Sequence, residues 1–222
     1  MPKDNINSSI PIFPLNLVLF PTSELPLHIF EDRYKRMVDY CITETQPVGI
    51  SLIKDGTEVG NYASPYDVGT FGYINSASNN PDGTIEITIT GKQKFKISEL
   101  LYDKPYLSAT IEQLDGSKEN PSSDDLLEVQ NSISRLNRVI HESYGGWARS
   151  YFVESDPQLL IYQGIDSVLQ NLSVPNSVKQ NLLESESFEQ QSQLLLPIIN
   201  ESVKLFEAEA SKNKPYLGFS KN

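Results

Sequence analysis

The sequence predicts an α+β protein in which a mainly-β N-terminal lobe, with six or seven strands and one helix, precedes a C-terminal helical bundle. Short apolar or alternating segments separated by turn residues fill the first half of the 222-residue chain. A polar segment rich in Gly, Ser and Pro follows, and beyond it apolar residues recur every three or four positions, the spacing of an amphipathic helix. We therefore divide the chain into a β-rich lobe (10–116), a linker (117–123), a helical lobe (124–210) and a polar tail (211–222).

The first apolar stretch contains prolines at positions 11, 14, 21 and 26. Proline excludes a helix here and restricts strands to short pieces or sheet edges. We expect two short strands, at about 10–13 and 24–28. The period then changes to that of an amphipathic helix, whose apolar stripe is Phe30, Tyr34, Met37, Val38 and Cys41.

Four further segments have the composition of strands. Residues 48–53, 68–74 and 106–111 are short apolar runs, and residues 84–90 alternate strictly between isoleucine and polar side chains. Beyond Gly91 the strand pattern continues, with Lys92, Lys94 and Lys96 on one side. We interpret these lysines as a solvated strand face that discourages edge pairing.

Four helices are expected after the linker. The first has an apolar seam from Leu126 to Ile140 and a serine cap at 122 or 123, and the second starts at Asp156 and Pro157, an N-cap followed by proline at the first helical position. A short third helix follows Pro175. Ser187 opens the fourth as part of a capping box, and Pro197 should kink or split that helix.

Composition limits the possible functions. The chain has 18 Lys and Arg against 29 Asp and Glu, a net charge of −11, which disfavours nucleic-acid binding because the phosphate backbone attracts basic surfaces. The single cysteine, Cys41, excludes an internal disulfide and a multi-cysteine zinc site. Neither a secretory signal nor an apolar run long enough to cross a membrane is present, so we expect a cytoplasmic protein without a membrane segment.

No motif predicts catalysis. The two histidines, His28 and His141, lack metal-ligand spacing, and we expect His28 to be structural. Cys41 lies on an apolar helix stripe, where burial raises the pKa of a thiol and suppresses the thiolate. The Thr90–Gln93 segment lacks the glycine and hydroxyl of a phosphate-binding loop. We predict no catalytic residue, no cofactor and no metal site.

One aromatic segment is a candidate for binding another protein. The only tryptophan lies beside two glycines and among other aromatic residues. Tryptophan and tyrosine often anchor protein interfaces, and a wedge that seals the two lobes together is the alternative interpretation. The candidate peptide-binding residues are Tyr144, Trp147, Tyr151 and Phe152. We assign most of the apolar residues between Phe13 and Phe30 to the core and nominate none of them as a site residue.

An ordered set of short blocks resembles a known family. The blocks are Ile12–Leu15, Val18–Pro21, Leu25–Tyr34, Val68–Ile74, Asp82–Thr84, Thr90–Ile97 and Val178–Glu184. Together they resemble the N-terminal domain of Lon protease, in the version found in stand-alone Lon substrate-binding-domain proteins. The resemblance implies a PUA-like β lobe joined to a helical bundle. In Lon proteases this domain helps to recognise substrates and supports assembly, while ATP hydrolysis and peptide cleavage belong to later domains, which these residues do not include.

The resemblance favours a non-catalytic protein-binding module that binds unfolded or client polypeptides in protein quality control, with a separate protease as a candidate partner. A cleft at the lobe junction, beside the aromatic segment, is the expected site. One alternative is a PUA-like RNA-binding protein that uses the lysine face. The other is a small hydrolase or transferase with a site at the lobe junction. The sequence does not specify an oligomeric state.

Overall fold

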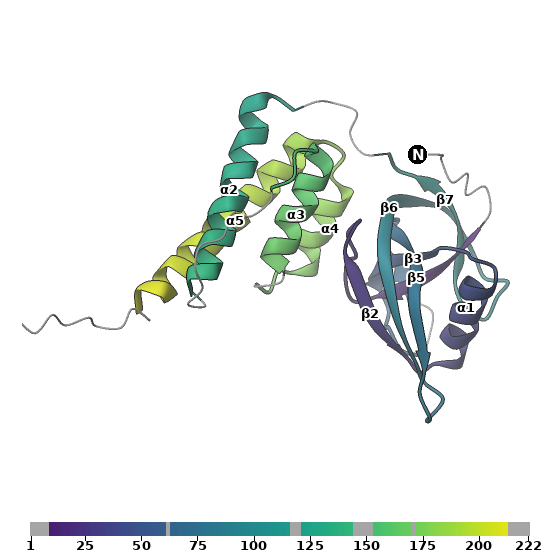
Figure 1. The fold of residues 1–222 in the computed structure, drawn as a ribbon. Helices are drawn as coiled ribbons and strands as arrows, with labels where there is room; N and C mark the ends of the chain where they lie inside the picture. Colours follow the sequence, from purple (N-terminus) through teal and green to yellow (C-terminus); the bar gives the residue numbers. More distant parts are fainter. Residues whose placement is uncertain (1–8, 61–62, 116–120, 144–152, 170–171, 213–222) are drawn as a thin grey trace, which may run out of the picture. The chain divides into compact units, whose positions relative to one another are not determined.

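The structure, a computed structural model, describes residues 9–60, 63–115, 121–143, 153–169 and 172–212, with side chains through residue 209. Figure 1 shows the fold as a ribbon coloured along the chain.

The chain forms two compact units. One, which we call the sheet unit, comprises Met1–Asp115 and Pro175–Glu184. The other, the helical unit, comprises Gly116–Val174 and Ser185–Asn222.

The sheet unit contains every described strand and two of the five described helices. The strands are β1 (Ile10–Leu15), β2 (Glu24–Ile29), β3 (Val48–Asp55), β4 (Ser64–Pro65), β5 (Val68–Asn79), β6 (Ile85–Leu101) and β7 (Ser108–Gln113). The helices of this unit are α1 (Asp32–Thr43) and α4 (Asn176–Glu184). The expected strands are therefore present, and β4 is an additional two-residue strand.

Five strands close on themselves. The sheet order is β1-β7-β6-β5-β3-β4, and a parallel pairing of β1 with β3 joins the ends of the first five strands into a ring. Strand β1 divides its pairing, because Ile10 and Pro11 pair with β7 whereas Ile12–Leu15 pair with β3. Each proline in β1 therefore has a paired neighbour on only one side, which accommodates its missing backbone N–H.

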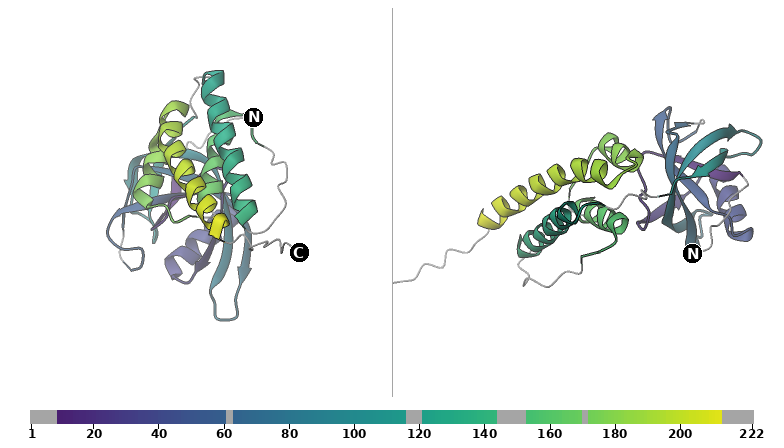
Figure 2. Two further views of the ribbon diagram at one scale, coloured as in Figure 1. Left: turned by 90° about the vertical axis from the view of Figure 1, so that its left-hand side faces the viewer. Right: turned by 90° about the horizontal axis from the view of Figure 1, so that it is seen from above.

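The long strand β6 extends beyond this ring. Its first half pairs with β2, from Ile29↔Ile85 to Glu24↔Thr90, and its second half pairs with β7. On its opposite side β6 pairs with β5 as far as Asn79↔Ile85, where the hairpin turns. In Figure 1 and in the left view of Figure 2, the β5–β6 hairpin extends past the end of α1.

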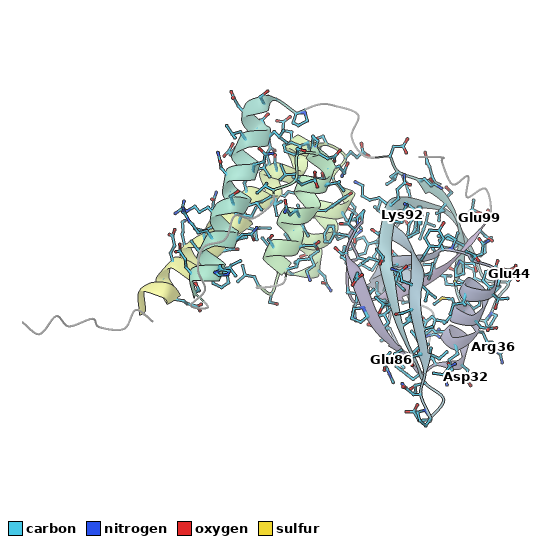
Figure 3. All side chains as sticks on the ribbon, viewed as in Figure 1. Asp32, Arg36, Glu44, Glu86, Lys92 and Glu99 are labelled. Carbon is cyan, nitrogen blue, oxygen red and sulfur yellow. The ribbon has the colours of Figure 1, made fainter. Side chains whose placement is uncertain are left out.

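Helix α1 packs its apolar stripe against the sheet. Tyr34, Met37, Val38 and Cys41 are all buried, in one cluster with core residues of β1, β2, β3 and β6. Figure 3 labels Asp32 and Arg36 on this helix and Glu44 directly after its end, and all three are exposed. The sequence prediction was wrong for Phe30, which precedes the helix and is 51% exposed.

Helix α4 packs with the strands, although we had expected it within the helical lobe. Gln180 Nε2 donates to the Val68 carbonyl at 3.0 Å, and Asn176 Nδ2 donates to the Asn16 carbonyl at 2.7 Å. Lys94 Nζ donates to the Leu183 carbonyl at 3.1 Å. This hydrogen bond contradicts the predicted solvated face of Lys92, Lys94 and Lys96. Lys94 is 5% exposed, so the three lysines do not form a solvated face.

The helical unit contains α2 (Ser123–Ser143), α3 (Pro157–Leu169) and α5 (Phe188–Lys212). The three pack against one another, and the views of Figures 1 and 2 show α2 alongside α5. Their apolar faces interlock closely at Gly164, where an added Cβ would lie 2.9 Å from Leu195 and 3.0 Å from Ile133.

Two predicted helix starts are confirmed by their caps. Ser122 Oγ accepts the Asp125 backbone N–H at 3.1 Å, and Asp156 Oδ1 accepts that of Leu159 at 3.0 Å. Ser187 Oγ likewise accepts the Gln190 backbone N–H at 3.2 Å at the start of α5. Pro197 does not split α5, which continues through it to Lys212. Within the described residues, no helix is long and apolar enough to cross a membrane.

Candidate functional site

The sheet unit has a pocket between its first two strands and α1. The floor consists of core side chains of β1, β2 and α1, and the rim comes from the β2–α1 connection and from the segment after β3. The lining residues are Phe13, Leu15, Leu27, His28, Ile29, Phe30, Glu31, Tyr34, Glu58 and Val59. Most of them are therefore apolar.

The floor is rigid because it belongs to the hydrophobic core. Phe13, Leu15, Ile29 and Tyr34 are between 2% and 6% exposed, and the Phe13 and Tyr34 rings pack with their centroids 4.1 Å apart. The guanidinium of Arg33 lies 4.4 Å from the centroid of the Tyr34 ring. A close-packed floor of this kind holds its shape without a ligand.

Two carboxylates attach the rim segments to one another. Glu31 Oε2 accepts hydrogen bonds from Arg33 Nε at 3.1 Å and from the Gly60 backbone N–H at 3.5 Å. Glu58 Oε2 accepts the Asn16 backbone N–H at 3.1 Å. These bonds position the 58–60 segment beside the start of α1, so the two carboxylates have a structural role at the rim.

The rim itself presents apolar surface to solvent. Phe30 is 51% exposed and Val59 is 58% exposed. His28 is half exposed; its Nδ1 lies 2.5 Å from Glu86 Oε1 across the β2–β6 pair, and its ring stacks at 6.3 Å on that of Phe30. The His28–Glu86 pair thus supports the Phe30 side of the rim.

Gly91 makes this placement of β2 possible. The Gly91 N–H donates to the Ser23 carbonyl and the Thr22 N–H donates to the Gly91 carbonyl, both at 2.9 Å. A Cβ at Gly91 would lie only 2.3 Å from the Phe20 carbonyl oxygen. The segment leading into β2 can therefore lie directly on β6 only because position 91 has no side chain.

The pocket is small, with a volume of about 60 Å³. Sites for cofactors and other small molecules usually measure roughly 300–1,000 Å³, and an engineered cavity that binds benzene measures about 150 Å³. The volume suits one small aliphatic side chain rather than a cofactor or an aromatic ring. The exposed rim adds apolar area around that side chain.

As its place on the apolar stripe of α1 predicts, Cys41 is buried, at 3% exposure. Its Sγ lies 4.0 Å from the Pro47 carbonyl oxygen, and burial raises the pKa of the thiol from 9.0 to about 12. Little thiolate therefore exists at neutral pH. Within the described residues, no group of three or more His, Cys, Asp or Glu side chains is arranged to hold a metal ion.

Comparison with known proteins identifies the family. The model of the ATP-dependent protease La (LON) substrate-binding domain matches residues 9–201. The chain belongs to this family. The match spans both units and agrees with the resemblance seen in the sequence blocks.

Individual relatives of the Lon substrate-binding domain family agree. Lon protease from Parabacteroides distasonis is 27% identical over 94% of this chain and 26% of its own length, and that from Flavobacterium johnsoniae is 24% identical over 93% and 26%. The chain thus spans about a quarter of the length of these curated relatives.

Solved structures of the family share the fold. A Lon N-terminal domain protein from Xanthomonas campestris has a TM-score of 0.61 and 22% identity, covering 85% of this chain and 97% of its own. The N-terminal domain of the Mycobacterium avium complex Lon protease has a TM-score of 0.58 and 14% identity, covering 93% and 100%.

The candidate residues predicted from sequence differ from those that form this pocket. Tyr144, Trp147, Tyr151 and Phe152 lie outside the described residues. The Phe13–Phe30 stretch, most of whose apolar residues we had assigned to the core, supplies both the buried floor and the exposed Phe30. Pro26 was the sequence signal that could have pointed to Phe30, because proline marks β2 as an edge strand and Phe30 follows that strand directly. No feature of the sequence pointed to Val59.

Proposed function

We propose that this member of the Lon substrate-binding domain family binds extended or unfolded segments of client polypeptides in protein quality control, without a catalytic step of its own. In this proposal one small aliphatic side chain of the client enters the pocket, and Phe30 and Val59 cover its neighbours. A separate protease in the cytoplasm would act on the bound client.

The observation that carries the proposal is a preformed apolar pocket of single-side-chain size with an exposed apolar rim. A pocket of this size recognises no more than one side chain, so it accepts many sequences that share an aliphatic residue. Folded proteins bury most such residues, whereas unfolded segments expose them. The geometry therefore favours unfolded chains over native ones.

The charge distribution does not favour RNA. The chain carries a net charge of −11, and the lysine face proposed from sequence is interrupted because Lys94 is buried and hydrogen-bonded to the Leu183 carbonyl. Only Lys92 and Lys96 of the three are exposed. Two lysines provide little of the counterion release that drives nucleic-acid binding.

The aromatic segment remains a second proposed contact for clients. Its residues Tyr144, Trp147, Tyr151 and Phe152 are tested by Trp147→Ala. We expect weaker client binding with an unchanged thermal midpoint. A Trp147→Ala variant that unfolds would instead identify the tryptophan as a packing wedge.

The pocket is tested by titrating the chain into a fluorescently labelled protein, in its unfolded form and in its native form, with anisotropy as the readout. We expect saturable binding of the unfolded form only. Val59→Ser should weaken this binding about fivefold, because Val59 exposes 58% of its surface and burying a whole valine contributes about 1.5–3 kcal/mol.

Ile42→Ser is the matched control, since Ile42 is a comparable aliphatic residue, 48% exposed, that lies on α1 and does not line the pocket. It should leave the affinity unchanged. Equal losses in the two variants would show that general surface apolarity, and not the pocket, binds the client. Equal binding of native and unfolded protein would refute the proposed preference.

A further inference from the structure

The outer half of β5 is a sheet edge with no partner strand in the described part of the chain. The pairing of β3 with β5 ends at Val48↔Gly72, and β4 pairs with β3 alone. From Ser76 to Asn79, β5 has β6 on one side only. Among the described residues, no backbone hydrogen bond outside the β5–β6 ladder involves these four residues.

This edge lacks the charges and prolines that often protect one, and its register shift lies at the inner end, between Ile74 and Ser76. Residues 75–79 read Asn-Ser-Ala-Ser-Asn, and all five are exposed, without a charge or a proline. The other edge of the same three-stranded region, β2, carries an exposed Glu24 and a central Pro26. Charges and prolines on an edge discourage pairing with another chain, so β2 is protected and the outer half of β5 is open.

The segment is also symmetric about Ala77. In an antiparallel pair of two identical strands centred there, Ala77 faces Ala77, and Ser76 of each copy faces Ser78 of the other. Small polar side chains meet in every pair except the central Ala77 pair, and no like charges oppose each other. This matters because two copies that each carry a charge of −11 repel one another over most of their surface.

We infer that two copies of this chain associate through the 75–79 segment of β5, paired antiparallel about Ala77 on a two-fold axis. The pairing continues the sheet of one copy into that of the other. Because the contact spans only about five residues per copy, the dimer is weak and depends on concentration.

The test is sedimentation velocity of the full chain from about 1 μM to about 0.5 mM. We expect the wild type to shift from monomer to dimer within this range. Two double variants at positions 76 and 78 introduce like or opposite charges across the proposed interface. Circular dichroism checks that each variant is folded. Ser76 and Ser78 are exposed on β5, so their substitution leaves the core unchanged.

The S76K/S78K variant places lysine opposite lysine in both symmetric pairs and should weaken the dimer about tenfold. S76E/S78K places glutamate opposite lysine in both pairs and should dimerise at least as well as the wild type. Both variants share Lys at position 78, opposite Glu86 of β6, so they differ only at position 76.

General electrostatics predicts the opposite order. S76K/S78K lowers the acidic net charge of each copy by two, which reduces overall repulsion and would favour association. Loss of the dimer in this variant and its retention in S76E/S78K therefore support the proposed pairing and its register. A wild type that remains monomeric at every concentration, or equal dimerisation of the two variants, overturns it.

Discussion

Gly91→Ala tests whether the close approach of the Phe20–Ser23 segment to β6 holds β2 in place. The added methyl group would lie 2.3 Å from the Phe20 carbonyl oxygen, about 1 Å closer than a normal contact, and the obstacle is backbone rather than a flexible side chain. The segment must move away and lose the two 2.9 Å hydrogen bonds that join Thr22 and Ser23 to Gly91.

The size of the effect follows from these contacts. Two backbone hydrogen bonds contribute about 1–3 kcal/mol together, and movement of Phe20, which is 1% exposed, removes part of its burial energy. We expect the free energy of unfolding to fall by about 2–4 kcal/mol. Because β2 supplies one wall of the pocket, client binding should weaken as well.

The assay combines urea unfolding with hydrogen exchange resolved by peptide, so that loss of protection can be assigned to β2 and β6. Gly83→Ala is the control: its Cβ would meet nothing within 4 Å, but its φ of 82° is strained for alanine, which costs about 1 kcal/mol. If Gly91→Ala costs no more than Gly83→Ala and leaves exchange in β2 unchanged, the reasoning is refuted.

Three further predictions concern stability. Between pH 9 and 12 the unfolded chain releases the Cys41 thiol proton that the folded chain keeps, so the free energy of unfolding falls as pH rises. In a series of alkaline denaturation experiments, Cys41→Ala should make the fall in unfolding free energy with pH shallower by about 1.4 kcal/mol per pH unit. Asp156→Ala should cost about 1 kcal/mol in urea unfolding through loss of the α3 N-cap; a change below about 0.3 kcal/mol would contradict this. Lys94→Met should destabilise by at least about 1 kcal/mol, because the buried Leu183 carbonyl loses its donor, whereas exposed Lys92→Met should be neutral in the same titration.

Local signals in the sequence predicted much of the fold. The apolar stripe from Tyr34 to Cys41 is the buried face of α1, and Asp156 and Pro157 mark the start of α3. Such features depend on hydrogen bonds and periodicity within a few residues, which a single sequence displays directly.

Features that depend on long-range contacts could not be predicted in this way. Alternation placed Lys94 on a solvated face, but α4, almost 90 residues later, covers it and supplies the Leu183 carbonyl. Pro197 lies within a helix whose apolar residues pack against α2 and α3, and this packing outweighs the local cost of proline. The pocket likewise combines Phe30 with Val59, and only the fold brings these two residues together.

The assignment of α4 to the sheet unit has a practical consequence for dissecting this protein. The sheet unit is discontinuous in sequence, because residues 116–174 of the helical unit separate residues 175–184 from the rest of the sheet unit. A fragment that ends at Asp115 would lose two hydrogen bonds. One joins Gln180 Nε2 to the Val68 carbonyl, and the other joins Lys94 Nζ to the Leu183 carbonyl. A fragment that retains residues 175–184, joined through an artificial linker to residue 115, would keep both of these hydrogen bonds.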